Sequence, residues 1–145
     1  LEPADYETKD SYTFDVTVSD GELSDTQTVT VNVTDVEEVP NEAPTITGGS
    51  GFIFKAENTS SDTILSTYTA DDANGDTLTY YLSGSDAALF DITNTGELSF
   101  IDPPDYESGK TFYRLSVNVS DDEFTATKSV SVIISTVVET TTLSA

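Results

Sequence analysis

The chain has 145 residues, of which 27 are acidic and 5 basic, for a formal net charge of −22. Nucleic acids and anionic membranes are excluded as partners, because both would repel a chain of this charge. The absence of Cys and His excludes disulfides, thiolate nucleophiles and histidine bases, and leaves hard oxygen ligands suited to Ca²⁺ or Mg²⁺. Membrane insertion is not expected, since no apolar run reaches the roughly 20 residues that spanning requires.

Alternating apolar and polar residues predict β-strands along the whole chain. The long stretches are residues 12–18, 28–33, 113–119 and 129–132, and the short ones are 45–47, 52–54, 64–69, 78–82, 90–92 and 98–101. Residues 86–89 are expected to form at most one helical turn. About seven strands in about a hundred residues predict an all-β fold, an Ig-like Greek-key sandwich.

One passage of the sequence occurs twice. Asp5-Tyr6-Glu7 opens residues 5–34, and Asp105-Tyr106-Glu107 opens the counterpart, with partners 101 positions apart after one inserted residue. A fixed period indicates an array of small domains. We therefore expect residues 1–36 to be the C-terminal part of a preceding repeat, 37–136 a complete repeat and 137–145 a tail, all within a longer protein. Two prolines and several acids in residues 35–44 predict a stiff acidic linker.

Motifs in the complete repeat resemble those of cadherin domains, in the bacterial cadherin-like variety. They occur in the family's order along the chain. They are Asn41-Glu42-Ala43-Pro44, Ala56-Glu57-Asn58, residues 70–80 with Asp72 and Asn74, Phe90-Asp91-Ile92 followed by Thr95-Gly96-Glu97-Leu98, Pro104-Asp105-Tyr106-Glu107, and Val119-Ser120-Asp121. The resemblance implies a cadherin-like sandwich in an extracellular or cell-surface protein.

The resemblance also implies calcium sites at the junctions between repeats. At the junction within this chain, it implies ligands from the first repeat, the linker and the second repeat. These are Asp5 and Glu7, then Asp35, Asn41 and Glu42, then Glu57, Asp72, Asn74 and Asp121. Asp105 and Glu107 would serve the next junction. Ca²⁺ takes six to eight oxygen ligands, more than one loop of this chain offers, so metal binding and ordering of a junction should be coupled.

The function implied is calcium-dependent adhesion or self-association, with neighbouring or identical repeats as partners. A calcium-stabilised polysaccharide-binding module and a passive structural spacer remain alternatives. Exposed aromatics such as Phe54, Tyr81 or Phe124 would stack on sugar rings, so two or three of them on one sheet face would favour polysaccharide. Enzymatic activity is not expected, since nucleophilic triads need a base that this chain lacks.

Residues 1–36 contain only two strands of a sandwich. Alone, such a hairpin is marginal in water and leaves an apolar face exposed. Because residues 5–34 resemble 105–135, the hairpin could occupy that position in a second copy of the chain. We therefore expect a homodimer formed through residues 1–36, in preference to a disordered segment.

Overall fold

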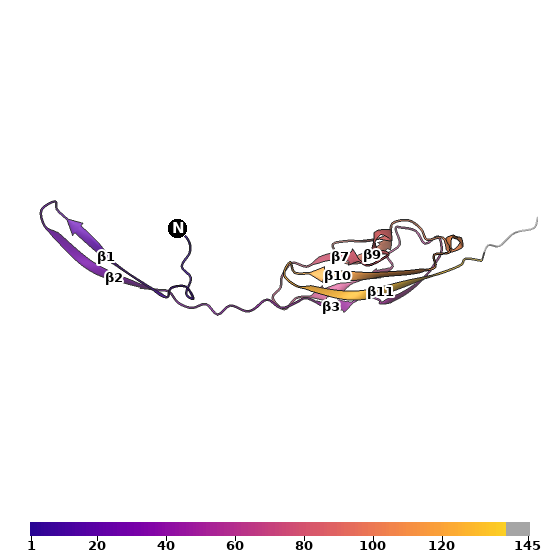
Figure 1. Cartoon of the computed structure of the whole chain (residues 1–145), viewed down its shortest axis with the longest axis horizontal. Helices are drawn as coiled ribbons and strands as arrows, with labels where there is room; N and C mark the ends of the chain where they lie inside the picture. Colours follow the sequence, from indigo (N-terminus) through magenta and orange to yellow (C-terminus); the bar gives the residue numbers. More distant parts are fainter. Residues whose placement is uncertain (139–145) are drawn as a thin grey trace, which may run out of the picture. The chain divides into compact units, whose positions relative to one another are not determined.

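The computed structural model describes residues 1–138, so most of the expected tail 137–145 lies outside the described residues (Figure 1). The chain divides into two units, Leu1–Pro40 and a second that begins at Asn41. The first unit contains one antiparallel hairpin, β1 (Ser11–Ser19) and β2 (Ser24–Asn32). The described part contains no helix that is long and apolar enough to cross a membrane.

The second unit is almost entirely β-structure, as the alternation predicts. Its strands are β3 (Thr45–Gly48), β4 (Phe52–Ala56), β5 (Ser66–Thr67), β6 (Thr69–Asp71), β7 (Thr79–Ser83), β8 (Phe90–Ile92), β9 (Glu97–Phe100), β10 (Phe112–Ser120) and β11 (Thr125–Ser135). Two single turns of 3-10 helix complete it, η1 (Ala87–Leu89) and η2 (Tyr106–Ser108). The first of these is the short helical turn expected at residues 86–89.

The strands of the second unit form two layers around one core. One layer is a four-stranded sheet in the order β4-β11-β10-β7, in which β4 runs parallel to β11. The other contains the pair β3-β6 and the three-stranded sheet β5-β9-β8. Inward side chains of both layers make one core, from Val117 and Val132 on one side to Leu98 and Phe100 on the other. The predicted sandwich is confirmed.

The stretch 64–69, predicted as one strand, is instead divided between β5 and β6 at Tyr68. Tyr68 is fully buried, its N–H donates to the Gly96 carbonyl and its hydroxyl donates to the Ser50 carbonyl. A Cβ at Gly96 would lie 2.0 Å from the Tyr68 carbonyl oxygen. The glycine thus allows a close backbone approach, which the alternation of residues does not reveal.

Candidate metal sites at the two ends of the second unit

Strand direction sorts the expected ligands of the second unit into two sets. β10 ends at Ser120, just before Asp121, and β11 then starts at Thr125 and runs the length of the sheet to Ser135. Ser135 pairs with Ala56, the last residue of the parallel strand β4, so Glu57 lies at the opposite end from Asp121. We call these the Glu57 end (Glu57, Asp105, Glu107) and the Asn41 end (Asn41, Glu42, Asp72, Asn74, Asp121).

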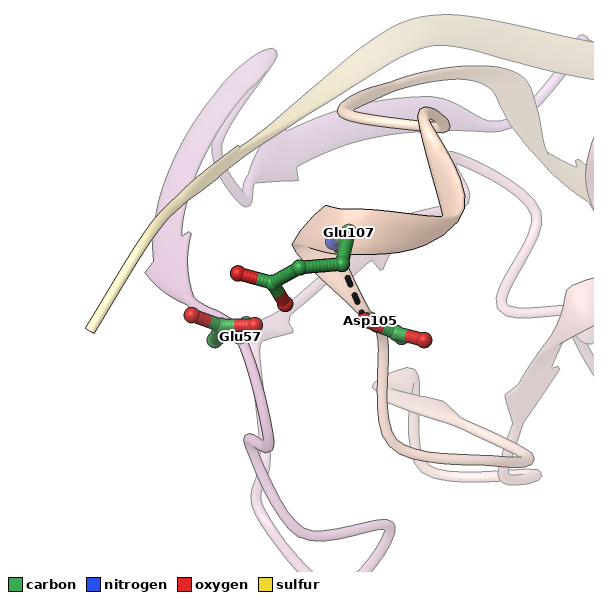
Figure 2. A group of neighbouring side chains, drawn as sticks. All are labelled: Glu57, Asp105 and Glu107. Atoms are coloured by element: carbon green, nitrogen blue, oxygen red, sulfur yellow. Dashed lines mark hydrogen bonds between the residues drawn. The ribbon is translucent and has the colours of Figure 1, made fainter. Parts of the chain in front are cut away.

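At the Glu57 end, three carboxylates gather within 4.8 Å of one another, the only such group of three among the described residues (Figure 2). Glu57 is buried, with 7% of its surface exposed. Its Oε1 accepts a hydrogen bond from the Val137 N–H at 2.7 Å, and its Oε2 accepts one from the Tyr106 N–H at 3.2 Å. Asp105 caps η2 by accepting from the Glu107 N–H at 3.0 Å. The backbone thus fixes two of the carboxylates and turns Glu107 toward Glu57.

The two glutamates influence each other's protonation. The Val137 N–H, followed by donors that include Tyr106, lowers the pKa of Glu57 despite its burial. The hydrogen bond with Glu57, followed by repulsion from the Glu57 carboxylate and a hydrogen bond with Asp105, raises the pKa of Glu107. Carboxylates this close are stabilised by a shared proton or by a cation. The donor set, all hard oxygen, fits Ca²⁺ or Mg²⁺.

At the Asn41 end, hydrogen bonds join the linker residues to the loops of the sandwich. The Asn41 amide nitrogen donates to Asp121 at 3.2 Å and to Glu123 at 3.0 Å. The Glu42 N–H donates to the Asn74 side-chain oxygen at 2.9 Å. Asp72 Oδ1 in turn accepts from the Asn74 N–H at 2.9 Å. These contacts form two hydrogen-bonded sets, Asn41 with Asp121 and Glu42 with Asn74 and Asp72, which the adjacent residues Asn41 and Glu42 connect along the chain.

Two oxygens of this group are buried and have no hydrogen-bond partner within the described part of the chain. They are Asn41 Oδ1 and Asp72 Oδ2. Leaving a buried acceptor unsatisfied costs about 1–3 kcal/mol, and more when the acceptor is charged. Since both atoms are oxygens, a cation would satisfy both. The chemistry of the donors therefore fits a hard cation at this end too.

In the first unit, the Asp5 and Asp35 carboxylates both influence the protonation of Glu7. Hydrogen bonds from Thr8 and Glu7 lower the pKa of Asp5. The strongest single influence on Glu7, its own N–H, lowers its pKa. The net pKa of Glu7 is nevertheless raised, because the hydrogen bond with Asp5, burial and the charges of Asp35 and Asp5 act the other way. Asp5 and Glu7 also line one hollow with Thr34 and Glu38.

The grouping of Glu57 with Asp72, Asn74 and Asp121 at one junction was wrong. The structure places Glu57 with Asp105 and Glu107, because β4 runs parallel to β11 and delivers its last residue to the other end of the sandwich. Asp72, Asn74 and Asp121 do lie together with Asn41 and Glu42. The structure thus corrects the end of the fold at which Glu57 lies, and the role of these residues as metal ligands stays a prediction.

Two contributors were missed in the sequence. Glu123 binds the Asn41 amide, and the Val137 N–H holds Glu57. Glu123 could have been found, because Glu22 stands at the matching position of the first passage and the acid thus recurs. A backbone donor such as Val137 carries no signal in the sequence.

Known proteins were compared with the chain by sequence and by structure. No protein-family model matches the chain, and no curated protein matches it. Among solved structures, human protocadherin-24 EC1-2 is similar at 27% identity and a TM-score of 0.57, covering 66% of this chain and 44% of that structure. The protocadherin gammaB7 EC3-6 cis-dimer is similar at 23% identity and a TM-score of 0.56 over 90% of this chain and 34% of that one. Drosophila N-cadherin EC1-3 is similar at 18% identity and a TM-score of 0.61 over 88% and 44%.

These likenesses define the class of the fold, an Ig-like sandwich of the kind found in cadherin extracellular repeats. The chain carries a cadherin-like domain, as its motifs indicate. It spans less than half of the length of the structures that it matches.

Proposed function

We propose that the second unit is a calcium-binding, cadherin-like repeat of a bacterial surface or secreted protein, where it contributes to adhesion or self-association outside the cell. The observation that carries this proposal is the group of Glu57, Asp105 and Glu107, three carboxylates held within 4.8 Å around a buried glutamate. An exposed solvated acidic surface does not require a buried member. A hard cation explains why the fold positions these charges together.

Calcium at the Glu57 end would be held by Glu57, Asp105 and Glu107, and its charge would offset the effect of the neighbouring Glu57 carboxylate, which raises the pKa of Glu107. At the Asn41 end the unpartnered oxygens of Asn41 and Asp72 would be ligands, with Asp121 beside them. Glu42 and Asn74 belong to the same group. With one oxygen from each residue, neither set alone reaches the six to eight oxygens of a complete calcium shell. The contribution of Asp5, Glu7 and Asp35 to a shared junction site stays a prediction.

Adhesion is proposed to occur between like repeats, neighbouring or identical. The support is the similarity to cadherin repeats, one of which is described as a cis-dimer. A net charge of −22 opposes contact between two copies. Bound calcium would reduce that charge, which makes self-association depend on the metal.

Calorimetric titration of the chain with Ca²⁺ tests the proposal. We expect saturable binding with dissociation constants on the order of 10⁻⁴–10⁻³ M, as in extracellular calcium modules, and weaker binding of Mg²⁺. Calcium at 100 times its dissociation constant should add about 2.7 kcal/mol to the free energy of unfolding, seen as a rise in melting temperature that a chelator reverses.

The matched variants are Glu107→Gln, which removes one charge from the Glu57 end, and Asp62→Asn, which removes one charge from an exposed loop. Glu107→Gln should weaken calcium binding at this end at least tenfold, and Asp62→Asn should not change it. Equal effects of the two variants, or a stabilisation no larger than NaCl gives at the same ionic strength, would contradict the proposal.

A further inference from the structure

The outer face of the four-stranded sheet exposes aromatic side chains. Phe52 and Phe54 on β4 are 70% and 69% exposed, and Phe112 on β10 is 40% exposed. Phe54 and Phe112 both pair with Ile133 of β11, so these three residues form one row across adjacent strands. With neighbouring strands about 4.8 Å apart, the two phenylalanines of the row stand roughly 10 Å apart. The row is a flat apolar platform.

Charge on this sheet differs from the rest of the chain. The four strands β4, β7, β10 and β11 contain no Asp or Glu, although the chain has 27 acidic residues. They contain three of its 5 basic residues, of which Arg114 lies on the outer face, whereas Lys55 and Lys128 lie beside the inward residues Ile134 and Val117. The Arg114 guanidinium lies over the Phe112 ring, 5.1 Å from its centroid. An uncharged or electron-rich partner would therefore meet no carboxylate on these strands.

A polar hollow adjoins the platform. It has a volume of about 310 Å³ and is lined on the outer face by Arg114, Ser116, Ser129 and Ser131. Ser131 pairs with both Phe52 and Arg114, so a residue that lines the hollow is also a direct neighbour of the exposed Phe52. Gly84, at φ +107, stands at its rim where a Cβ would lie 3.0 Å from the Leu115 Cα. The hollow thus offers hydroxyls and one guanidinium next to apolar rings.

The first hairpin shows that the strand register does not require these outward side chains. Positions of β1 and β2 that match Phe112, Arg114 and Ile133 hold Ser11, Thr13 and Asn32, with the same strand register. The inward positions remain apolar in both hairpins. Outward aromatic and apolar residues are therefore specific to the second unit, which is typical of an interaction surface.

We propose that this face binds an uncharged polysaccharide chain. Sugar rings present C–H groups that pack on aromatic faces, and their hydroxyls pair with serine, threonine and guanidinium groups such as those of the hollow. An uncharged polymer is not repelled by a chain of net charge −22, whereas a second copy carries the same charge and is. The proposal goes beyond the calcium function and involves none of its ligands.

Affinity electrophoresis in native gels tests this, with the full chain run through gels containing a soluble β-glucan, a xyloglucan, a galactomannan or a mannan. We expect at least one polymer to retard the chain, and the retardation to persist in chelator while the second unit remains folded by circular dichroism. The double variant Phe54→Ser/Phe112→Ser should weaken the apparent affinity at least tenfold. Phe124→Ser changes an exposed aromatic in the β10–β11 turn, outside the four strands, and should not.

Retardation by none of the four polymers, or equal retardation of the folded double variant and the parent chain, would overturn the proposal. So would a dimer of the parent chain that the double variant abolishes without any change in retardation, because the face would then bind a second copy. Loss of calcium binding with retained retardation would overturn the calcium function alone.

Discussion

The two hairpins of this chain, β1–β2 and β10–β11, have nearly the same pattern of residues in two different surroundings. In β10, Leu115 is 3% exposed and packs in the core, whereas its counterpart in β1, Phe14, is 50% exposed. Strand register is the same in both, with Ser11 opposite Asn32 and Phe112 opposite Ile133. Local sequence is therefore enough to specify a hairpin, but the burial of its apolar face depends on the other strands of a repeat.

The turns of the two hairpins are also alike. Asp20 accepts hydrogen bonds from the N–H groups of Glu22 and Leu23, and Asp121 accepts them from Glu123 and Phe124. These bonds, first those of Leu23 and Phe124, lower the pKa of both aspartates. Asp121 additionally accepts a hydrogen bond from the Asn41 side-chain amide. The same turn thus closes a hairpin in one copy and additionally forms part of a candidate metal site in the other.

The two hairpins should differ most in the cost to stability of truncating a matched pair of inward side chains. Leu115→Ala leaves a cavity in the core and should cost about 2–5 kcal/mol in the free energy of unfolding. Phe14→Ala, at the equivalent but exposed position, should change it by less than about 0.5 kcal/mol. Urea unfolding of the second unit, followed by circular dichroism, measures both. Similar costs for the two variants would show that the first hairpin is packed on a core.

A second difference concerns association. We expect the exposed face of β1–β2 to pair with a second copy, because an apolar sheet face and unpaired strand edges favour contact between molecules. Val16→Asp places a charge on that face and should raise the dimer dissociation constant more than tenfold, while Thr17→Asp, on the adjacent outward position, should raise it far less.

Sedimentation at micromolar concentration measures this association. A strictly monomeric chain whose residues 1–36 exchange amide hydrogens at random-coil rates would contradict the expected homodimer.

The smallest difference concerns one turn residue. Gly21 adopts φ 92, and the matching Asp122 adopts φ 80, a left-handed conformation that strains a residue with a Cβ. Asp122→Gly should therefore stabilise the second unit by up to about 1 kcal/mol. The relief of strain should exceed the cost of the added conformational entropy that glycine gives the unfolded chain. Thermal unfolding measures the change. A loss of stability would mean that the Asp122 carboxylate makes a contact worth more than the strain.

Residue alternation was sufficient to predict the strands, because inward rows such as Tyr113, Leu115, Val117 and Val119 must be apolar in any sandwich. The acidic motifs named the carboxylates and amides of both candidate sites except Glu123, and their role as metal ligands stays a prediction. The end at which Glu57 lies could not be predicted, since it depends on β4 pairing parallel to β11, a contact between distant segments. The division of residues 64–69 at Tyr68 depends similarly on the backbone of Gly96.

An NMR titration with Ca²⁺ that maps amide shifts along the chain tests the central claim most directly, the claim that calcium binds at the two ends of the second unit. We predict saturating shifts at Glu57, Tyr106, Glu107 and Val137, whose amides or carboxylates make the Glu57 end. A second group of saturating shifts should appear at Glu42, Asn74 and Glu123, around the unpartnered oxygens of the Asn41 end. Small, unsaturated shifts spread over exposed acids such as Asp62 and Asp91 would show general counterion screening instead, and would contradict the account.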